Sequence, residues 1–224
     1  MDDNYKIEYI KKIAVLNVYD SQIRDWRGGE EVSFIKAVLP ATKAMEDNMI
    51  KLGYLKIDSR FGCYINASLY RKKYNYRTQF EMDIKNLYSK EIFFIAKDIF
   101  TNDPRFNFLI EYDKESYNIR LKKWIQDSVY KFVCTYNGKL VGFIILAPRN
   151  KTMLEVRLAA ILQRYRMLGL GPELYIKALE FCNELGYKGL YGSIETINLS
   201  AVNLYSYLNG KFVDVKDTYL KKVK

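Results

Sequence analysis

Hydrophobic and polar residues recur along most of the chain with periods that predict helices and strands. Met45, Met49 and Leu52 have helical spacing and predict one helix, which starts near Pro40 and is capped by Gly53. The same spacing predicts helices over residues 83–99, with Asp83 as N-cap, over 113–129 and over 198–208. A further helix is predicted after Gly169 and Gly171 and runs to about Leu185. Extended apolar or alternating runs predict strands at 31–38, 54–65, 76–82, 152–161 and 188–196, and one or two closing strands at 211–223.

The strongest local signal is "YKFVCTYNGKLVGFIILAP", residues 130–148. Two apolar runs flank Asn137-Gly138, a residue pair that the type I′ turn prefers. The segment therefore predicts an antiparallel hairpin.

The order of the predicted elements indicates the fold class. From residue 76 onward the chain reads strand, two helices, hairpin, strand, helix, strand, helix, strand. This order is typical of a mixed α/β (α+β) fold with a largely antiparallel sheet. The polar stretch "RKKYN", residues 71–75, is a candidate linker. We expect a small α/β module at 1–72 and a larger domain at 73–224.

The chain of 224 residues, 49% of them hydrophobic, is long enough for a substantial core. Its apolar runs are too short to cross a bilayer, and no apolar segment of a signal peptide is seen at its start. Three widely separated cysteines, Cys63, Cys134 and Cys182, argue against a disulfide framework or a zinc site. We therefore expect a cytoplasmic protein with no metal and no membrane partner.

Charge and the absence of histidine narrow the chemistry. With no histidine, a His base, a Ser-His-Asp or Cys-His arrangement and imidazole metal ligands are excluded. The formal net charge is +10, but the basic residues are spread along the chain and form no nucleic-acid-binding motif. We expect no nucleic-acid partner, and a positive field also suits small substrates that carry phosphate.

The stretch "RYRMLGLGPELYIKALEFCNEL" begins at Arg164 and follows a predicted strand. Gly169 and Gly171 would let the backbone approach a diphosphate at the N-terminus of the next helix. The alternative is a tight turn with Pro172 at the first helical position. The sequence differs from both the Walker loop and the dinucleotide fingerprint, so each interpretation remains open here.

A second stretch, "NLSAVNLYSYLNGKF", begins at Asn198 after another predicted strand. Asn198 is a suitable N-cap, and Ala201 and Tyr205 share one helix face. Tyr205 is either a functional phenol or a core tyrosine, one of 20 in the chain.

Together the two stretches resemble the Gcn5-related N-acetyltransferase (GNAT) superfamily. The pattern [RQ]-x-x-G-x-[GA] is matched by Arg166, Gly169 and Gly171, and N-x-x-A-x-x-x-Y by Asn198, Ala201 and Tyr205. The resemblance implies the GNAT fold and acetyl-CoA as cosubstrate, held in a cleft between strands that end near Ile161 and Ile194. The resemblance implies that the following residues bind the coenzyme: Ala159, Ala160, Ile161, Arg166, Met167, Leu168, Gly169, Leu170, Gly171, Asn198 and Ala201.

The resemblance also implies direct acetyl transfer to an amine. Tyr205 matches the tyrosine that acts as the acid, and a phenol with a pKa of about 10 is protonated at neutral pH. Glu155 and Glu195 are the nearest candidates for a base acting through water, and Glu155 is preferred because Glu195 is better explained as a solvated charge. The chain departs from the family at Gln163, where proline is usual.

The chain further resembles the dTDP-fucosamine acetyltransferase (WecD-like) branch. The segments "NDPRFNF" (102–108), "LEFCNELG" (179–186) and "DTYLKKV" (217–223) carry this resemblance. It implies a nucleotide-linked amino-deoxy sugar as acceptor, with Arg105 at the diphosphate and Phe106 and Tyr112 at the sugar or base. Arg105 is equally consistent with a surface cation. The N-terminal module would form a pocket wall or a homodimer surface.

Two other functions remain open. One is an N-terminal acetyltransferase of proteins or peptides, which needs an open groove for a peptide backbone. The other is a non-catalytic module that binds acetyl-CoA, in which Tyr205 would be inert. The residues alone do not identify the acceptor, the base or the oligomeric state.

Overall fold

The computed structural model describes residues 5–10, 13–18, 34–70, 75–83, 87–101, 103 and 114–223. Its contacts divide the chain into two compact units: unit 1 (Met1–Phe61, Asp103–Arg120 and Asp214–Lys224) and unit 2 (Gly62–Asn102 and Leu121–Val213). Both units are discontinuous, because strands β4 (Leu55–Asn66) and β10 (Lys211–Lys222) contribute residues to each. The single boundary expected after residue 72 does not describe this division, and the domain limits as such stay a prediction. No helix within the described residues is long and apolar enough to cross a membrane.

Unit 1 is built on strands β1 (Tyr5–Ile10), β2 (Ile13–Val18) and β3 (Phe34–Pro40), which continue in the order β1-β2-β3-β10-β4. The β2–β3 pair is parallel, and the β1–β2 and β3–β10 pairs are antiparallel. A small apolar cluster fills this unit, formed by Ile35, Ala37, Leu39, Met49, Tyr54 and Tyr219.

Helix α1 (Lys43–Lys51) supplies Met49 to that cluster. Its N-cap is Thr42, whose hydroxyl accepts from the Met45 amide at 3.2 Å, whereas Pro40 ends strand β3. The predicted helix start at Pro40 was therefore too early by three residues. The predicted glycine cap is confirmed, because Gly53 follows the helix with a φ of +78°.

Unit 2 contains a mixed, largely antiparallel sheet in the order β4-β9-β8-β7-β6-β5. Its further strands are β5 (Gln79–Met82), β6 (Tyr130–Tyr136), β7 (Lys139–Asn150), β8 (Met153–Ile161) and β9 (Gly189–Glu195). Pairs β5–β6, β6–β7 and β7–β8 are antiparallel, and β8–β9 is parallel. Asn137 and Gly138 have φ of +50° and +69°, so the predicted hairpin turn is confirmed.

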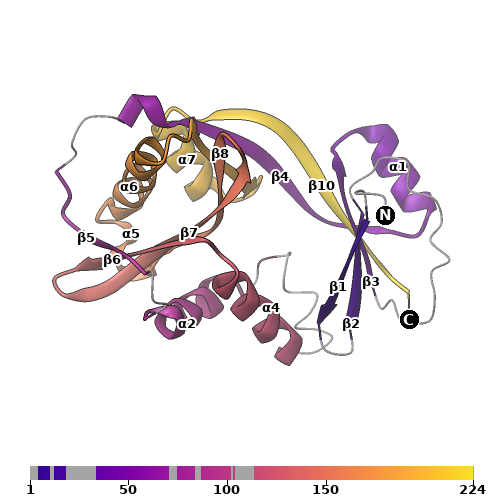
Figure 1. Cartoon of the computed structure of the whole chain (residues 1–224). Helices are drawn as coiled ribbons and strands as arrows, with labels where there is room; N and C mark the ends of the chain where they lie inside the picture. The colour runs from indigo at the N-terminus through magenta and orange to yellow at the C-terminus, as the bar shows by residue number, and fades with distance from the viewer. Residues whose placement is uncertain are drawn as a thin grey trace. The chain divides into compact units, whose positions relative to one another are not determined.

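The helices of unit 2 lie on both faces of this sheet. Helices α2 (Ser89–Ile99) and α6 (Leu170–Glu184) are on opposite sides of β7, and α7 (Leu199–Tyr207) is on the α6 side (Figure 1). Helix α4 (Lys114–Gln126) contributes residues to both units, and two short helices, η1 (Ala67–Tyr70) and α5 (Gln163–Arg166), complete the set.

Helix α6 is the central element of the unit 2 core. Its 15 residues bury an apolar face that includes Leu174, Leu179 and Cys182. This face packs on apolar residues of the sheet, among them Ile144, Leu146, Leu154, Leu190 and Ile194. The packing fixes the position of the N-terminus of α6, where the glycine stretch lies.

The start of α2 differs from the prediction. Asp83 is buried, and its carboxylate accepts from the amides of Leu87 at 2.6 Å and Tyr88 at 3.2 Å. It thus caps the turn that precedes the helix, and the helix itself begins at Ser89. An aspartate side chain accepts hydrogen bonds from the nearest free backbone amides that follow it, and here those amides belong to a turn and not to the helix.

Candidate active site

Strands β8 and β9 separate partway along their length. They pair in parallel from Met153 with Gly189 to Val156 with Gly192, and the ladder between them ends there. Strand β8 nevertheless continues to Ile161 and β9 to Glu195. We call the open part the fork. Parallel strands that diverge leave backbone groups between them for a ligand.

A β-bulge coincides with the fork. Opposite β7, Val156 pairs with Leu146 and Leu158 with Ile145, so Arg157 is the extra residue of the bulge. An extra residue of this kind increases the local twist of its strand. Past the bulge, Ala159, Ala160 and Ile161 pair with β7 on one edge only, and their other edge faces the fork. An extended ligand could therefore add to that edge as a strand does.

The glycine stretch forms the entrance to α6. Gly169 has φ +71° and ψ +20°, the left-handed conformation that glycine adopts without strain, and it is the N-cap of the helix. The amides of Leu168 and Gly169 donate to the carbonyls of Tyr165 and Arg166 inside this turn. The amides left for an anion are those of Leu170 and Gly171, because the first turn of a helix has no carbonyl partners for them.

Pro172 is the third residue of α6, and the sequence interpretation that placed it at the first helical position was wrong. The helix begins two residues earlier, at Leu170. The amide that proline lacks would have had no partner in the helix at this position either, so the proline costs no helical hydrogen bond. Gly171 has open space around it, since a Cβ there would find only Leu204 Cδ2, at 3.9 Å.

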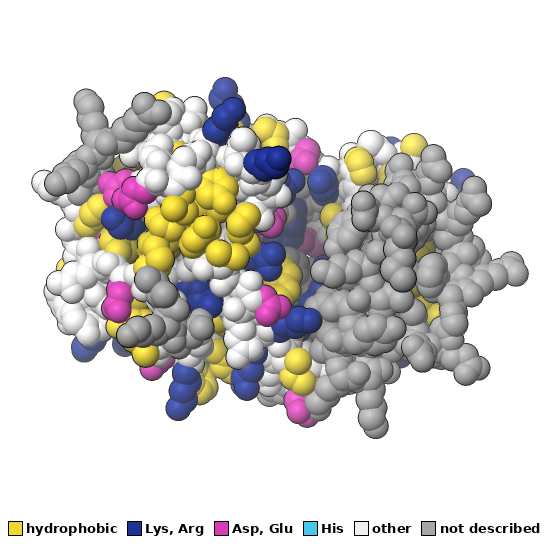
Figure 2. Space-filling view, viewed as in Figure 1, with side chains coloured by type: hydrophobic (Ala, Val, Ile, Leu, Met, Phe, Trp, Pro, Cys, Tyr) yellow, Lys and Arg dark blue, Asp and Glu magenta, His cyan; other side chains and the backbone are white. Residues whose placement is uncertain are grey.

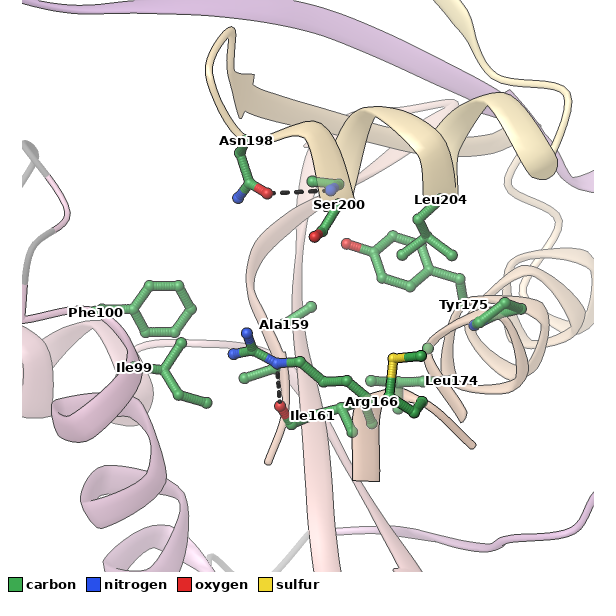
Figure 3. A pocket seen from close by; sticks show the side chains of 15 residues that line it. Ile99, Phe100, Ala159, Ile161, Arg166, Leu174, Tyr175, Asn198, Ser200 and Leu204 are labelled. Atoms are coloured by element: carbon green, nitrogen blue, oxygen red, sulfur yellow. Dashed lines mark hydrogen bonds between the residues drawn. The ribbon is translucent and has the colours of Figure 1, made fainter. Parts of the chain in front are cut away.

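Arg166 joins the fork to the glycine stretch. Its Nε donates to the Ile161 carbonyl at 3.0 Å, at the end of β8 (Figure 3). The remaining nitrogens of the guanidinium lie at the cavity described below. A fixed cation beside two free amides at a helix N-terminus suits a phosphate group.

A buried carboxylate fixes the first turn of α6. Glu173 is 1% exposed, and Oε1 accepts from Arg77 Nε at 2.7 Å. Its Oε2 accepts from the Thr78 hydroxyl at 2.8 Å and from the amides of Arg77 and Thr78 at 3.1 and 3.2 Å. Four donors compensate the burial of this charge. This cluster was not predicted, because its members are about a hundred residues apart in the sequence and no motif links them.

These elements surround a cavity of about 450 Å³. It is lined by Ile99, Phe100, Ala159, Ala160, Ile161, Arg166, Met167, Gly171, Pro172, Leu174, Tyr175, Asn198, Ser200, Ala201 and Leu204. Figure 3 shows contributions from the end of α2, from β8, from the start of α6 and from α7. In Figure 2, hydrophobic side chains gather on the visible face over the region of β7, β8 and α7, with basic side chains near them. A largely apolar cavity with a few polar groups is the usual form of a ligand site.

Most of the predicted coenzyme residues meet at this cavity. Eight of them line it: Ala159, Ala160, Ile161, Arg166, Met167, Gly171, Asn198 and Ala201. Of the others, Gly169 shapes the turn, Leu168 is 39% exposed, and the side chain of Leu170 is buried in the core. Asn198 is also the N-cap of α7, as predicted, because its Oδ1 accepts from the Ala201 amide at 3.1 Å.

Two tyrosines lie at the inner end of the cavity, and only one of them lines it. Tyr175 of α6 points its hydroxyl toward the middle of the cavity (Figure 3). Tyr205 of α7 is 2% exposed, lies behind Tyr175 with the ring centroids 5.3 Å apart, and is absent from the described lining. Its hydroxyl occupies the space that a Cβ at Gly192 would fill, at 1.9 Å. The acid role of Tyr205 stays a prediction.

Burial shapes the chemistry of both phenols. It raises the pKa of Tyr175 to about 12, and a side-chain hydrogen bond with Tyr205 acts in the opposite direction. Burial also raises the pKa of Tyr205 well above 10, and the same hydrogen bond raises it further. Both phenols are therefore protonated at neutral pH. Tyr175 was not among the predicted site residues, although its position four residues after Gly171 places both on one helix face.

The two candidate bases lie outside the cavity lining. Glu155 is on the paired part of β8, opposite Tyr191 of β9, and its carboxylate is 3.4 Å from Arg149 Nη1. The guanidinium of Arg149 lies over the Tyr191 ring, 3.6 Å from its centroid. Glu195 is the last residue of β9. The three predicted acceptor residues, Arg105, Phe106 and Tyr112, lie outside the described residues.

Residues 91–209, slightly more than half of the chain, match the model of the acetyltransferase (GNAT) family. None of the curated proteins matches the sequence.

The chain resembles many solved structures. A GCN5-related N-acetyltransferase from Sphaerobacter thermophilus superposes with a TM-score of 0.65 at 10% identity, over 98% of this chain and 76% of that one. A GCN5-related N-acetyltransferase from Kribbella flavida superposes with a TM-score of 0.60 at 11% identity, over 95% of this chain and 81% of that one. A tandem GNAT protein from the clavulanic acid biosynthesis pathway superposes with a TM-score of 0.60 at 10% identity, over 95% of this chain and 76% of that one. At these identities the matches show the fold alone, and they confirm the predicted GNAT fold and its mixed, mostly antiparallel sheet.

Proposed function

Because this chain belongs to the GNAT acetyltransferase family, we propose that it transfers the acetyl group of acetyl-CoA directly to the amine of a nucleotide-linked (dTDP- or UDP-) amino-deoxy sugar. The observation that supports transfer from a coenzyme is the fork between β8 and β9. One open strand edge, two unpartnered helix amides and an arginine meet there around a single cavity.

The fork fits the shape and charge of the cosubstrate. The diphosphate would accept from the amides of Leu170 and Gly171, with Arg166 beside it. The pantetheine arm would extend along the free edge of Ala159–Ile161, adding to the sheet as a further strand. An alanine pair at this edge leaves room for the arm, and a side chain at Gly171 would project into the same space.

Transfer would proceed by attack of a neutral amine on the thioester carbonyl. The N–C bond forms, the C–S bond breaks, and the sulfur leaves with the electron pair as coenzyme A thiolate. The amine nitrogen loses a proton to water, for which Glu155 is the proposed final acceptor. Tyr205 would act on the leaving sulfur through Tyr175, which separates it from the cavity.

The sugar-nucleotide acceptor rests on the resemblance to the dTDP-fucosamine acetyltransferase branch and on charge. A net charge of +10 favours a substrate that carries a diphosphate. Arg105 would contact that diphosphate, and Phe106 and Tyr112 would contact the sugar or base. The module at 1–72 would complete the acceptor pocket or form a homodimer surface, which light scattering of the purified protein distinguishes.

The test is release of coenzyme A thiol from acetyl-CoA in the presence of a panel of acceptors. The panel contains dTDP- and UDP-amino-deoxy sugars, the same sugars without the nucleotide, and peptides with free N-termini. We expect turnover with one class of sugar nucleotide and background hydrolysis with all other members. Arg105→Gln should then raise the KM for the sugar nucleotide and leave the KM for acetyl-CoA unchanged.

Two outcomes contradict this proposal. Turnover only with peptides would make the protein an N-terminal acetyltransferase and remove the role of Arg105. Tight binding of acetyl-CoA by calorimetry, with no turnover across the panel, would favour the non-catalytic binding module. The contribution of Glu155 is tested separately, since Glu155→Gln should lower kcat and leave the KM for acetyl-CoA unchanged if the carboxylate is the final proton acceptor.

A further inference from the structure

Few groups in the cavity can donate a proton or a hydrogen bond to a leaving sulfur. Of the described lining residues, four have polar side chains: Arg166, Tyr175, Asn198 and Ser200. Arg166 is held at the end of β8 and Asn198 at the start of α7, each by a hydrogen bond. The two hydroxyls that face the cavity are therefore those of Tyr175 and Ser200. Ser200 is exposed at the rim, and Tyr175 is 8% exposed at the inner end.

Tyr175 lies where the reactive end of an extended coenzyme would arrive. It follows Gly171 by four residues on α6, which corresponds to about 6 Å along the helix axis. A ligand whose diphosphate binds the amides of Leu170 and Gly171 and whose arm follows β8 would pass this turn next. The hydroxyl of Tyr175 points into the cavity from there, toward α7 (Figure 3).

Tyr205 is placed to orient this hydroxyl. The two rings pack edge to face with their centroids 5.3 Å apart, and the interaction between their hydroxyls lowers the pKa of Tyr175 and raises that of Tyr205. Gly192 provides the space in which the Tyr205 hydroxyl is held.

We propose that Tyr175 is the catalytic hydrogen-bond donor to the coenzyme sulfur, and that Tyr205 is a positioning residue acting through it. This inference rests on the proposed acetyl transfer and names the residue that carries the leaving-group step. As the amine nitrogen bonds to the carbonyl carbon and the C–S bond breaks, the Tyr175 O–H donates to the sulfur, which departs as a thiolate. The proton lost by the amine goes to water, and the thiolate is protonated by water after its release.

The first test requires no acceptor. The pKa of the coenzyme A thiol is measured in its complex with the protein from the ultraviolet absorbance of the thiolate, with the desulfo-coenzyme A complex as blank. We expect a bound thiol pKa below the free value of about 8.5. Tyr175→Phe should raise it by about one unit, Tyr205→Phe by about half as much, and Ser200→Ala should leave it unchanged.

The second test uses the acceptor found by the panel above. Tyr175→Phe should lower kcat about 10- to 100-fold while the KM for acetyl-CoA changes less than about twofold. Tyr205→Phe should have a smaller effect on kcat in the same direction. Circular dichroism and the affinity for acetyl-CoA show whether each variant keeps its fold and its site.

The outcomes separate this inference from the proposed function. An equal thiol pKa in the parent and in Tyr175→Phe, or a shift seen only in Ser200→Ala, overturns the inference even if amines are acetylated. A thiol pKa lowered through Tyr175 without turnover on any amine supports the sulfur contact and contradicts the proposed function. A protein that binds neither coenzyme A nor acetyl-CoA contradicts both.

Discussion

The two halves of strand β8 show how a site arises within a continuous element. From Met153 to Val156 the strand is paired on both edges, with β7 and with β9. From Leu158 to Ile161 it pairs with β7 alone, because the ladder with β9 ends at Val156. The paired half carries Leu154 in the core, whereas the open half lines the cavity. Unused ladder positions are thus what makes part of this strand available to a ligand.

The open half of β8 lacks the hydrogen bonds to β9 that hold the paired half in place, so other contacts must fix its position. The Arg166 side chain bonds the Ile161 carbonyl, and the Glu173 carboxylate holds Arg77 and Thr78 at the first turn of α6. These side-chain bonds replace the missing ladder as the fixed frame of the fork. A site that must remain open for a ligand is held by contacts to its rim.

The largest expected effect comes from disturbing the paired half. In Gly192→Ala the added Cβ would lie 1.9 Å from the Tyr205 hydroxyl, in a fully buried place. We expect about 3 kcal/mol lower stability in urea unfolding, together with loss of the Tyr205 position. Gly171→Ala is the matched control, because its Cβ meets only an atom at 3.9 Å and should leave stability nearly unchanged. Equal stability of both variants would contradict the position assigned to Tyr205.

Alkaline pH acts on Tyr175, which lines the same cavity as the open half. Burial raises the pKa of Tyr175 to about 12, above its unfolded value of about 10. Its contribution of about 2 to 3 kcal/mol is therefore complete below pH 10 and is lost as pH rises from 10 toward 12. Unfolding free energies measured over this range should fall less steeply in Tyr175→Phe. Tyr207→Phe is the control at an exposed tyrosine, and its unfolding free energy should depend on pH as in the parent. The same pH dependence in Tyr175→Phe as in the parent would contradict the burial of the Tyr175 hydroxyl.

Substituting the arginine at the rim tests the open half alone. Arg166→Gln removes the bond to Ile161 and the cation beside the proposed phosphate site, so the Kd for acetyl-CoA should rise about 10- to 30-fold, or about 1.5 to 2 kcal/mol. Arg164→Gln is the control, because that guanidinium lies 5.0 Å from the Tyr165 ring centroid and does not line the cavity. Calorimetry on both variants measures the difference. A similar loss in both would indicate a general effect of charge.

The smallest expected effect comes from a methyl group added at the mouth of the fork. Gly171→Ala should lower the affinity for acetyl-CoA about fivefold, or about 1 kcal/mol, because its Cβ would occupy space beside the amides. The fold should be retained, since alanine is favoured over glycine in a helix. Calorimetry of acetyl-CoA binding tests this, and an unchanged affinity would place the diphosphate elsewhere.

Local signals in the sequence predicted much of the fold. The Asn137-Gly138 pair specified the hairpin turn, and the apolar periods located β8, β9, α6 and α7 to within a few residues. Helix starts were predicted less well, as at Asp83, because a capping side chain binds the nearest free amides whether they belong to a helix or to a turn.

The sequence by itself determined the residues that form the glycine turn before α6, because a left-handed glycine, a helix N-terminus and a nearby arginine are specified within a few positions of one another. Tertiary structure alone decided which side chains face the cavity. Tyr205 was the tyrosine that the motif indicated, yet packing of α6 against α7 puts Tyr175 in front of it. The same holds for Glu173, whose partners come from a segment about a hundred residues away. Contacts of this kind depend on how helices pack on the sheet, and no local spacing encodes them.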